Sequence, residues 1–139
     1  MSGSDVTVHP SAIVHPQARL EPGVWVGPGC VFGPDVTAGR NSRFEANVFV
    51  GGWTTIGADN HFFPGSVIGT EPQDIGYKGE PTRVEIGDRN IFREFCTVHR
   101  ATAKESRLTR IGGDNYFMAY SHVAHDCRVG EGTIFLHGA

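Results

Sequence analysis

The sequence has few of the features that mark a disulfide-rich, membrane or nucleic-acid-binding protein. Its three cysteines are an odd number without CxxC spacing, which argues against a disulfide framework and a zinc knuckle. It has no apolar run of about 18 residues, and the N-terminus MSGSDVTVHP does not resemble a signal peptide. A net charge of -3 gives no general attraction to nucleic acid or anionic membranes. We therefore expect a cytoplasmic protein without nucleic-acid partner or membrane insertion.

What the sequence does have is a six-residue period. An aliphatic or aromatic residue recurs at eleven successive sixth positions: Val8, Val14, Leu20, Val26, Phe32, Ala38, Phe44, Val50, Ile56, Phe62 and Ile68. In most repeats a small or compact residue follows four positions later, so each repeat has two inward-facing positions. Proline and glycine recur between them and are typical of tight corners.

A fixed period of six predicts an all-β parallel β-helix, in which short strands turn at corners and stacked coils bury one core. Three hexapeptides make one triangular coil, and about six to seven coils, spaced roughly 4.8 Å apart, make a prism. We expect this hexapeptide-repeat solenoid to be a single domain over residues 1–139. Because Cys30, Cys96 and Cys127 all fall in the smaller inward position, we expect three buried thiols.

Two loops, at about 71–83 and 103–109, interrupt the period. Three hexapeptides, which make one full coil, lie between them, so both loops must project from the same corner on successive levels. Loops on a rigid scaffold often carry function. The same arithmetic brings seven polar residues to this corner: Gln73, Asp74, His99, Arg100, His122, His125 and Asp126.

The adjacent His125 and Asp126 suit general base catalysis, because a carboxylate can orient an imidazole that titrates near neutral pH. The alternative is a solvated surface pair. Asp74 can cap a turn or accept hydrogen bonds from sugar hydroxyls. His122 and His125, with His99, also offer a zinc site like that of the gamma-class carbonic anhydrases. Their spacing differs from that pattern, whose last two ligands lie five residues apart.

Two strings are more specific than the period: QDIGYKGEPTRVEIGDRNIFREFCTVHR at 73–100 and SHVAHDCRVG at 121–130. Together they resemble the UDP-N-acetylglucosamine acyltransferases, and the resemblance covers essentially the whole chain. It implies a left-handed winding, against the usual right-handed rule for parallel crossovers, and a homotrimer with its sites between subunits. Such enzymes pass an (R)-3-hydroxyacyl group from acyl carrier protein to the 3-hydroxyl of UDP-N-acetylglucosamine, the first step of lipid A biosynthesis, without a cofactor.

The resemblance also implies roles for particular residues. His125 would be the general base, and Asp126 would orient and polarise it. Four residues would bind the substrates or line their cleft: Asp74, Gln73, His122 and His99. No metal is implied. The family often has a lysine two positions after the loop aspartate, whereas this sequence has Gly76 there and a lysine only at Lys78.

Family members continue into further coils and a helical C-terminal domain. We therefore expect residues 1–139 to be a truncated β-helix domain, with the oxyanion donor beyond residue 139 and weak activity or none in the isolated chain. Two other functions are compatible with the sequence. One is a catalytically incomplete trimeric scaffold that binds the sugar nucleotide, and the other is a zinc hydratase like the gamma-class carbonic anhydrases.

Overall fold

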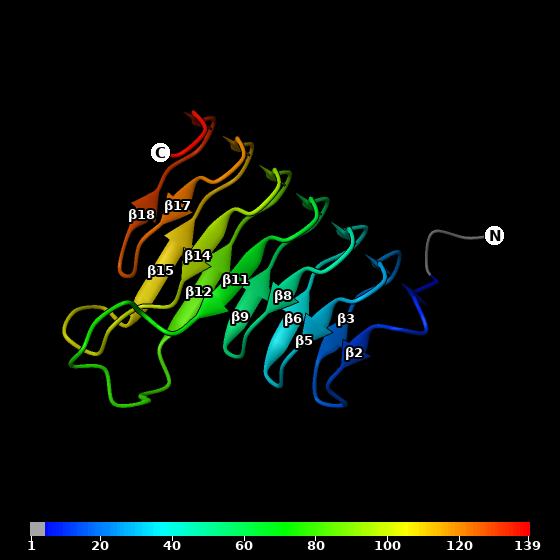
Figure 1. The fold of residues 1–139 in the computed structure, drawn as a ribbon, viewed down its shortest axis with the longest axis horizontal. Helices are drawn as coiled ribbons and strands as arrows, with labels where there is room; N and C mark the ends of the chain where they lie inside the picture. The colour runs from blue at the N-terminus through cyan, green and yellow to red at the C-terminus, as the bar shows by residue number, and fades with distance from the viewer. Residues whose placement is uncertain (1–4) are drawn as a thin grey trace.

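The chain forms a parallel β-helix whose coils stack along one axis, as the computed structural model shows for residues 5–139 (Figure 1). Each coil contributes one short strand to each of three sheets, which are the faces of a triangular prism. The elements of residues 5–139 are all strands. Within this range no helix is long and apolar enough to cross a membrane. The predicted all-β solenoid is confirmed.

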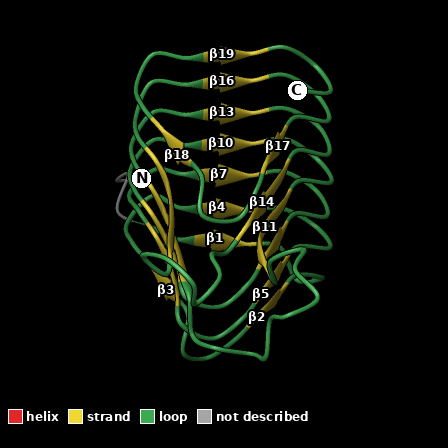
Figure 2. Ribbon diagram, turned by 90° about the vertical axis from the view of Figure 1, so that its left-hand side faces the viewer, coloured by secondary structure: helices red, strands yellow, loops and turns green. Residues whose placement is uncertain are grey.

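The strands pair in parallel within three sheets, which we call A, B and C. Sheet A, whose strands lie like rungs in Figure 2, contains β1 (Thr7–Val8), β4 (Trp25–Val26), β7 (Arg43–Phe44), β10 (His61–Phe62), β13 (Ile91–Phe92), β16 (Tyr116–Phe117) and β19 (Ile134–Phe135). Sheet B contains β2 (Ile13–Val14), β5 (Val31–Phe32), β8 (Phe49–Val50), β11 (Val67–Thr70), β14 (Thr97–His99) and β17 (His122–Val123). Sheet C contains β3 (Arg19–Leu20), β6 (Val36–Ala38), β9 (Thr54–Ile56), β12 (Arg83–Ile86), β15 (Leu108–Ile111) and β18 (Arg128–Val129).

The register confirms three hexapeptides per coil. In sheet A, Phe44 lies beside Phe62, one plain coil further along the chain. Phe62 then lies beside Phe92 and Phe92 beside Phe117, so each loop lengthens its coil without changing which residues align. The inward positions predicted from the period therefore stay in register from the first coil to the last.

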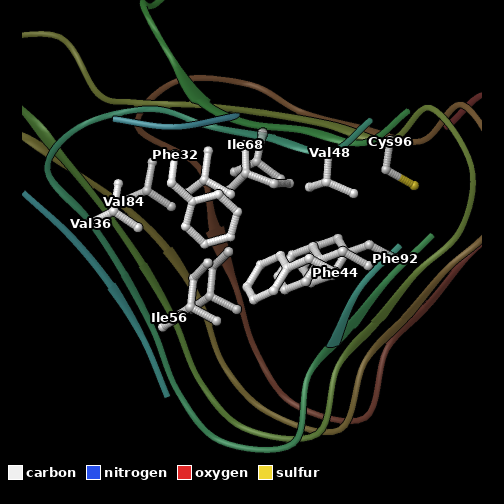
Figure 3. Packing of buried hydrophobic residues seen from close by; sticks show 14 of the residues in the cluster. Phe32, Val36, Phe44, Val48, Ile56, Ile68, Val84, Phe92 and Cys96 are labelled. Atoms are coloured by element: carbon white, nitrogen blue, oxygen red, sulfur yellow. The ribbon is translucent and has the colours of Figure 1, made fainter. Parts of the chain in front are cut away.

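A column of stacked phenylalanines fills the core beside sheet A (Figure 3). The rings of Phe44, Phe62, Phe92 and Phe117 lie nearly parallel, with centroids 4.8, 4.7 and 4.5 Å apart. This offset stacking follows from the in-register strands, which place identical side chains on top of one another. Burial of such rings is the main source of stability in a solenoid of two-residue strands.

The cysteine prediction is correct at two positions and wrong at the third. Cys30 and Cys96 are buried, and burial raises the pKa of the Cys96 thiol to about 11. Cys127 is exposed. It precedes β18, the outermost strand of sheet C in the structure, where no further coil lies over the inward position.

A second column, of buried asparagines, lines the corner between sheets C and A. Asn90 Oδ1 accepts the backbone N–H of Asn115, and Asn90 Nδ2 donates to the carbonyl of Gly112. Asn60 makes the same pair of contacts one level below, to Asn90 and Gly87. These side chains satisfy backbone groups at a corner where the sheet ladders are interrupted.

The corners also depend on a conformation that the period alone does not reveal. At most corners the third residue after an inward aliphatic or aromatic residue has a positive φ, as in Gly29 at 71°, Asp35 at 58° and Asn47 at 59°. With proline one position earlier, as in Pro28 and Pro34, this is the geometry that a type II turn requires. Glycine, asparagine and aspartate tolerate it best.

Candidate functional site

Both loops leave the prism at the corner between sheets B and C, as predicted (Figure 1). The first loop, residues 71–82, connects β11 to β12, and the second, residues 100–107, connects β14 to β15. Since β11 and β14 are neighbours in sheet B, the loops lie on successive levels. The second loop begins three residues earlier than the sequence predicted.

The outer face of sheet B leads to this corner as a single column of aligned side chains. From the first coil upward the column reads Ile13, Val31, Phe49, Val67, Thr97 and His122. Ile13, Val31 and Phe49 are exposed apolar side chains. The face therefore changes from apolar to polar at the level of the loops.

Two histidines pack against each other on this face. The His99 and His122 rings lie 5.1 Å apart at 72°, in an edge-to-face arrangement. His122 Nδ1 lies 2.7 Å from Thr97 Oγ1, and His99 Nδ1 donates to the Glu71 carbonyl at 2.6 Å. Burial lowers the pKa of His122, and the nearby His99 and His125 lower it further. His122 is thereby favoured in its neutral form.

His125 and Asp126 form a close pair at the end of β17. His125 Nδ1 lies 2.8 Å from Asp126 Oδ2, with side-chain exposures of 35% and 11%. Because an ionised carboxylate only accepts hydrogen bonds, Nδ1 carries the proton when the ring is neutral, and Nε2 then keeps its lone pair. Burial alone would raise the pKa of Asp126, but hydrogen bonds from His125 and Thr102 outweigh it and lower the pKa.

Asp126 is held by two threonines on the level of the second loop. Its Oδ2 accepts the Thr102 hydroxyl at 2.8 Å and the Thr102 N–H at 3.1 Å. Its own N–H donates to Thr109 Oγ1 at 2.9 Å, and its φ of 64° matches the other corner residues. The carboxylate is therefore fixed by groups other than the histidine that it orients.

Asp74 lies across from this pair on the first loop. Its Oδ1 accepts the Gly76 N–H and its Oδ2 the Lys104 ammonium, both at 2.9 Å. Hydrogen bonds from Lys104 and then Gly76 lower the pKa of Asp74, and the charge of His125 adds to this. Gln73, the preceding residue, is exposed on the same loop.

Arg100 lies at the corner between sheets B and C, as the sequence predicted, but its side chain is not exposed there. It is nearly buried and donates to the Gly69 carbonyl at 3.0 Å and to the Tyr77 hydroxyl at 2.7 Å, beneath the first loop. The register of sheet B slips after Ile68, so that Thr70 pairs with His99. This slip lies in β11, where Gly69 is the extra residue. Arg100 lies two positions after the inward Val98 and points inward by the ordinary alternation of a strand, where it anchors the loop.

The sequence reasoning missed the residues that hold the site together. Thr97 contacts His122, Thr102 and Thr109 bind Asp126, and Lys104 binds Asp74. Nothing in the period distinguishes these threonines from those elsewhere. Lys104 lies in the second loop, whose conformation the period does not determine.

Two further observations concern ligands. An open groove of about 420 Å³ adjoins His99, with walls formed by Gly33, Pro34, Phe49, Gly51, Gly52, Gly69, Thr70, Glu71 and Arg100. Within residues 5–139, no three or more His, Cys, Asp or Glu side chains gather in the arrangement of a metal site. His99, His122 and His125 share a corner, but their nitrogens do not converge on one point.

The chain resembles known sugar-nucleotide acyltransferases in sequence and in structure. It is 54% identical over 88 residues to the acyl-[acyl-carrier-protein]–UDP-N-acetylglucosamine O-acyltransferase of Verminephrobacter eiseniae, a match over 63% of this chain and 34% of the relative. LpxA from Acinetobacter baumannii superposes with a TM-score of 0.90 at 43% identity, over 91% of this chain and 49% of that one. For the Francisella novicida UDP-N-acetylglucosamine acyltransferase the values are 0.88 and 40%, over 90% and 46%. No family model matches the chain.

These comparisons confirm the resemblance predicted from the two sequence strings. They also confirm the left-handed winding of the parallel β-helix, which the period could not provide. The chain spans about half the length of the solved relatives and about a third of the curated one.

Proposed function

We propose that this chain carries the acceptor-activating centre of an acyl-[acyl-carrier-protein]–UDP-N-acetylglucosamine O-acyltransferase. It would act in the cytoplasm and transfer an (R)-3-hydroxyacyl group to the 3-hydroxyl of UDP-N-acetylglucosamine, the first step of lipid A biosynthesis. The observation that carries this proposal is the half-exposed His125, hydrogen-bonded through Nδ1 to Asp126 at the corner where both loops meet. The similarity to acyltransferases of this specificity supports it.

The residues of the corner suit the chemistry of acyl transfer to an alcohol. His125 Nε2 removes the proton of the sugar hydroxyl while the oxygen attacks the thioester carbonyl carbon. The C–S bond then breaks, and the His125 imidazolium returns the proton to the departing thiolate of acyl carrier protein. Asp126 stabilises the imidazolium between these steps, and base catalysis of this kind contributes roughly 10²- to 10⁴-fold in rate.

The remaining polar residues of the corner bind the two substrates in this proposal. Asp74 accepts a sugar hydroxyl, and Gln73 beside it contacts the acyl end. His122 and His99 line the same cleft, where the lowered pKa of His122 keeps that ring neutral and able to donate one hydrogen bond and accept another. No cofactor or metal takes part.

We propose further that the chain works as a homotrimer. Exposed Ile13, Val31 and Phe49 form an apolar stripe on the outer face of sheet B, and His122 continues the same column. A neighbouring subunit that covers this stripe would place its own surface beside the histidines, which fits a site shared between subunits.

A transfer assay tests the proposed function. The gene product that carries this chain is incubated with UDP-N-acetylglucosamine and (R)-3-hydroxyacyl-acyl carrier proteins of several chain lengths, and the 3-O-acylated sugar nucleotide is measured by mass spectrometry. Sugar-nucleotide binding without product would favour the scaffold instead. Stoichiometric zinc in the purified protein, together with carbon dioxide hydration, would favour the carbonic-anhydrase-like alternative.

A further inference from the structure

Within the proposed acyltransferase function, we propose that Lys104 is a positioning residue that holds Asp74 toward the acceptor sugar, with the role that a lysine at position 76 would otherwise fill. Lys104 comes from the second loop and Asp74 from the first, so this one contact joins the two loops that form the corner. The inference concerns how the site binds its acceptor and can fail while the proposed function holds.

The contacts of Asp74 show what Lys104 contributes. The carboxylate accepts two hydrogen bonds, from the Gly76 N–H on Oδ1 and from the Lys104 ammonium on Oδ2. The first contact lies within the loop and fixes only a local turn. The second ties the carboxylate to the second loop, the loop whose Thr102 binds Asp126. The charges of the corner act in the same sense, since the charge of His125 contributes to the lowered pKa of Asp74 and that of Asp126 to the raised pKa of Lys104.

The exposure of the pair indicates that its purpose is not stability. The Lys104 side chain is 70% exposed, and exposed ion pairs contribute little to folding because water and salt screen them. The exposed Lys104 ammonium can nevertheless fix the direction of the Asp74 carboxylate. It also keeps hydrogen-bond donors available for oxygen atoms of a bound sugar nucleotide.

Gly76 supplies the second line of evidence. A Cβ built on Gly76 would lie 3.7 Å from Lys104 Nζ and 3.5 Å from Asp74 Oδ1, which are ordinary contact distances, and its φ is not in the left-handed region. A side chain can therefore start at position 76 without a clash at Cβ, and a lysine there begins close to the same carboxylate. Lys78, the lysine of this loop, donates its backbone N–H to the Glu80 carboxylate. The cation beside Asp74 thus comes from Lys104 and not from Lys78.

The experiment exchanges the two positions. In transfer assays on the gene product that carries this chain, Lys104→Gln should raise KM for UDP-N-acetylglucosamine about tenfold, the loss expected for one charge-assisted hydrogen bond, with a much smaller change in kcat. Gly76→Lys in the Lys104→Gln background should restore most of the affinity. Lys78→Gln is the matched control, with KM within about twofold of the wild type because it removes an exposed lysine from the same loop without touching Asp74.

A second readout does not depend on turnover. Carboxyl titration by NMR should show that the pKa of Asp74 rises in Lys104→Gln and falls again in the Gly76→Lys/Lys104→Gln variant. An active wild type with unchanged KM in Lys104→Gln would overturn the inference and leave the proposed function intact. Failure of rescue by Gly76→Lys, with the fold preserved, would also overturn it. An inactive wild type would instead count against the proposed function.

Discussion

Two columns of polar side chains run along different corners of this prism, and they differ in how completely their hydrogen-bonding groups are used. In the asparagine column, Asn60, Asn90 and Asn115 are buried, and their amides bond to backbone groups of the adjacent levels. At the loop corner, His99, His122 and His125 are only partly buried. Each of these histidines is hydrogen-bonded through Nδ1, which leaves Nε2 for a ligand.

The difference separates a polar group that stabilises the fold from one that can act on a substrate. A buried amide whose donors and acceptors are all paired contributes to a unique structure and has nothing left to offer. A partly exposed imidazole oriented through one nitrogen keeps the other for chemistry. Changes in the asparagine column should therefore alter stability, and changes at the loop corner should alter activity.

The largest effect is expected at the loop corner. His125→Ala removes the proposed base and should lower kcat by roughly 10²- to 10⁴-fold while leaving the melting temperature nearly unchanged. His61→Ala is a matched control, because His61 also lies 2.7 Å from a carboxylate, that of Glu45, but on sheet A away from the loops. Equal losses of kcat in the two variants would contradict the assignment of His125.

The converse variant is Asn90→Leu in the asparagine column. It leaves the Asn115 N–H and the Gly112 carbonyl without their partner and removes one of two donors to Asn60 Oδ1, so it should lower the free energy of unfolding by about 3 kcal/mol or more. Urea denaturation measures this loss. Folded Asn90→Leu protein, assayed well below its melting temperature, should retain its kcat. A selective loss of kcat would remove the distinction between the two columns.

A smaller effect is expected for Asp126→Asn, because the base remains and only its partner is weakened. Loss of the hydrogen bond between His125 and a charged carboxylate should lower kcat about 10- to 100-fold. Asp114→Asn, which breaks an exposed pair with Arg89, is the control and should retain full activity. A wild-type pH–rate profile in Asp126→Asn would argue against Asp126 as the partner of the base.

The smallest effect concerns the pH dependence of stability at His122. Since the folded protein lowers the pKa of this ring, the unfolded chain binds its proton first as the pH falls below the ordinary histidine value of about 6.5. The free energy of unfolding therefore decreases as the pH falls from about 6.5 to the folded pKa. Above about 6.5 the ring is neutral in both states, and its titration does not affect stability. His122→Gln should lose less stability than the wild type between neutral and mildly acidic pH, as measured by urea midpoints. The exposed His137→Gln should behave like the wild type.

The sequence predicted the fold better than the site because the two depend on different kinds of information. The period alone gave the inward residues, three hexapeptides per coil and the shared corner of the loops, since one inserted loop cannot change the register on either side of it. It could not give the register slip between Ile68 and Thr70, which is a local backbone event, or the burial of Arg100 beneath the first loop. It also missed the contact of Lys104 with Asp74, because two irregular loops determine it.

The spacing between paired strands has a consequence for the order in which the molecule folds. Every strand pairs with the strand one coil away, so the chain can assemble level by level, with modest loop closures and no pairing between distant ends. The loop corner requires β11, β14 and β17 to be stacked before Asp74, His122 and His125 come together. During synthesis the lower coils can therefore be folded while the chemistry is still unassembled, and the site is gained in a late step.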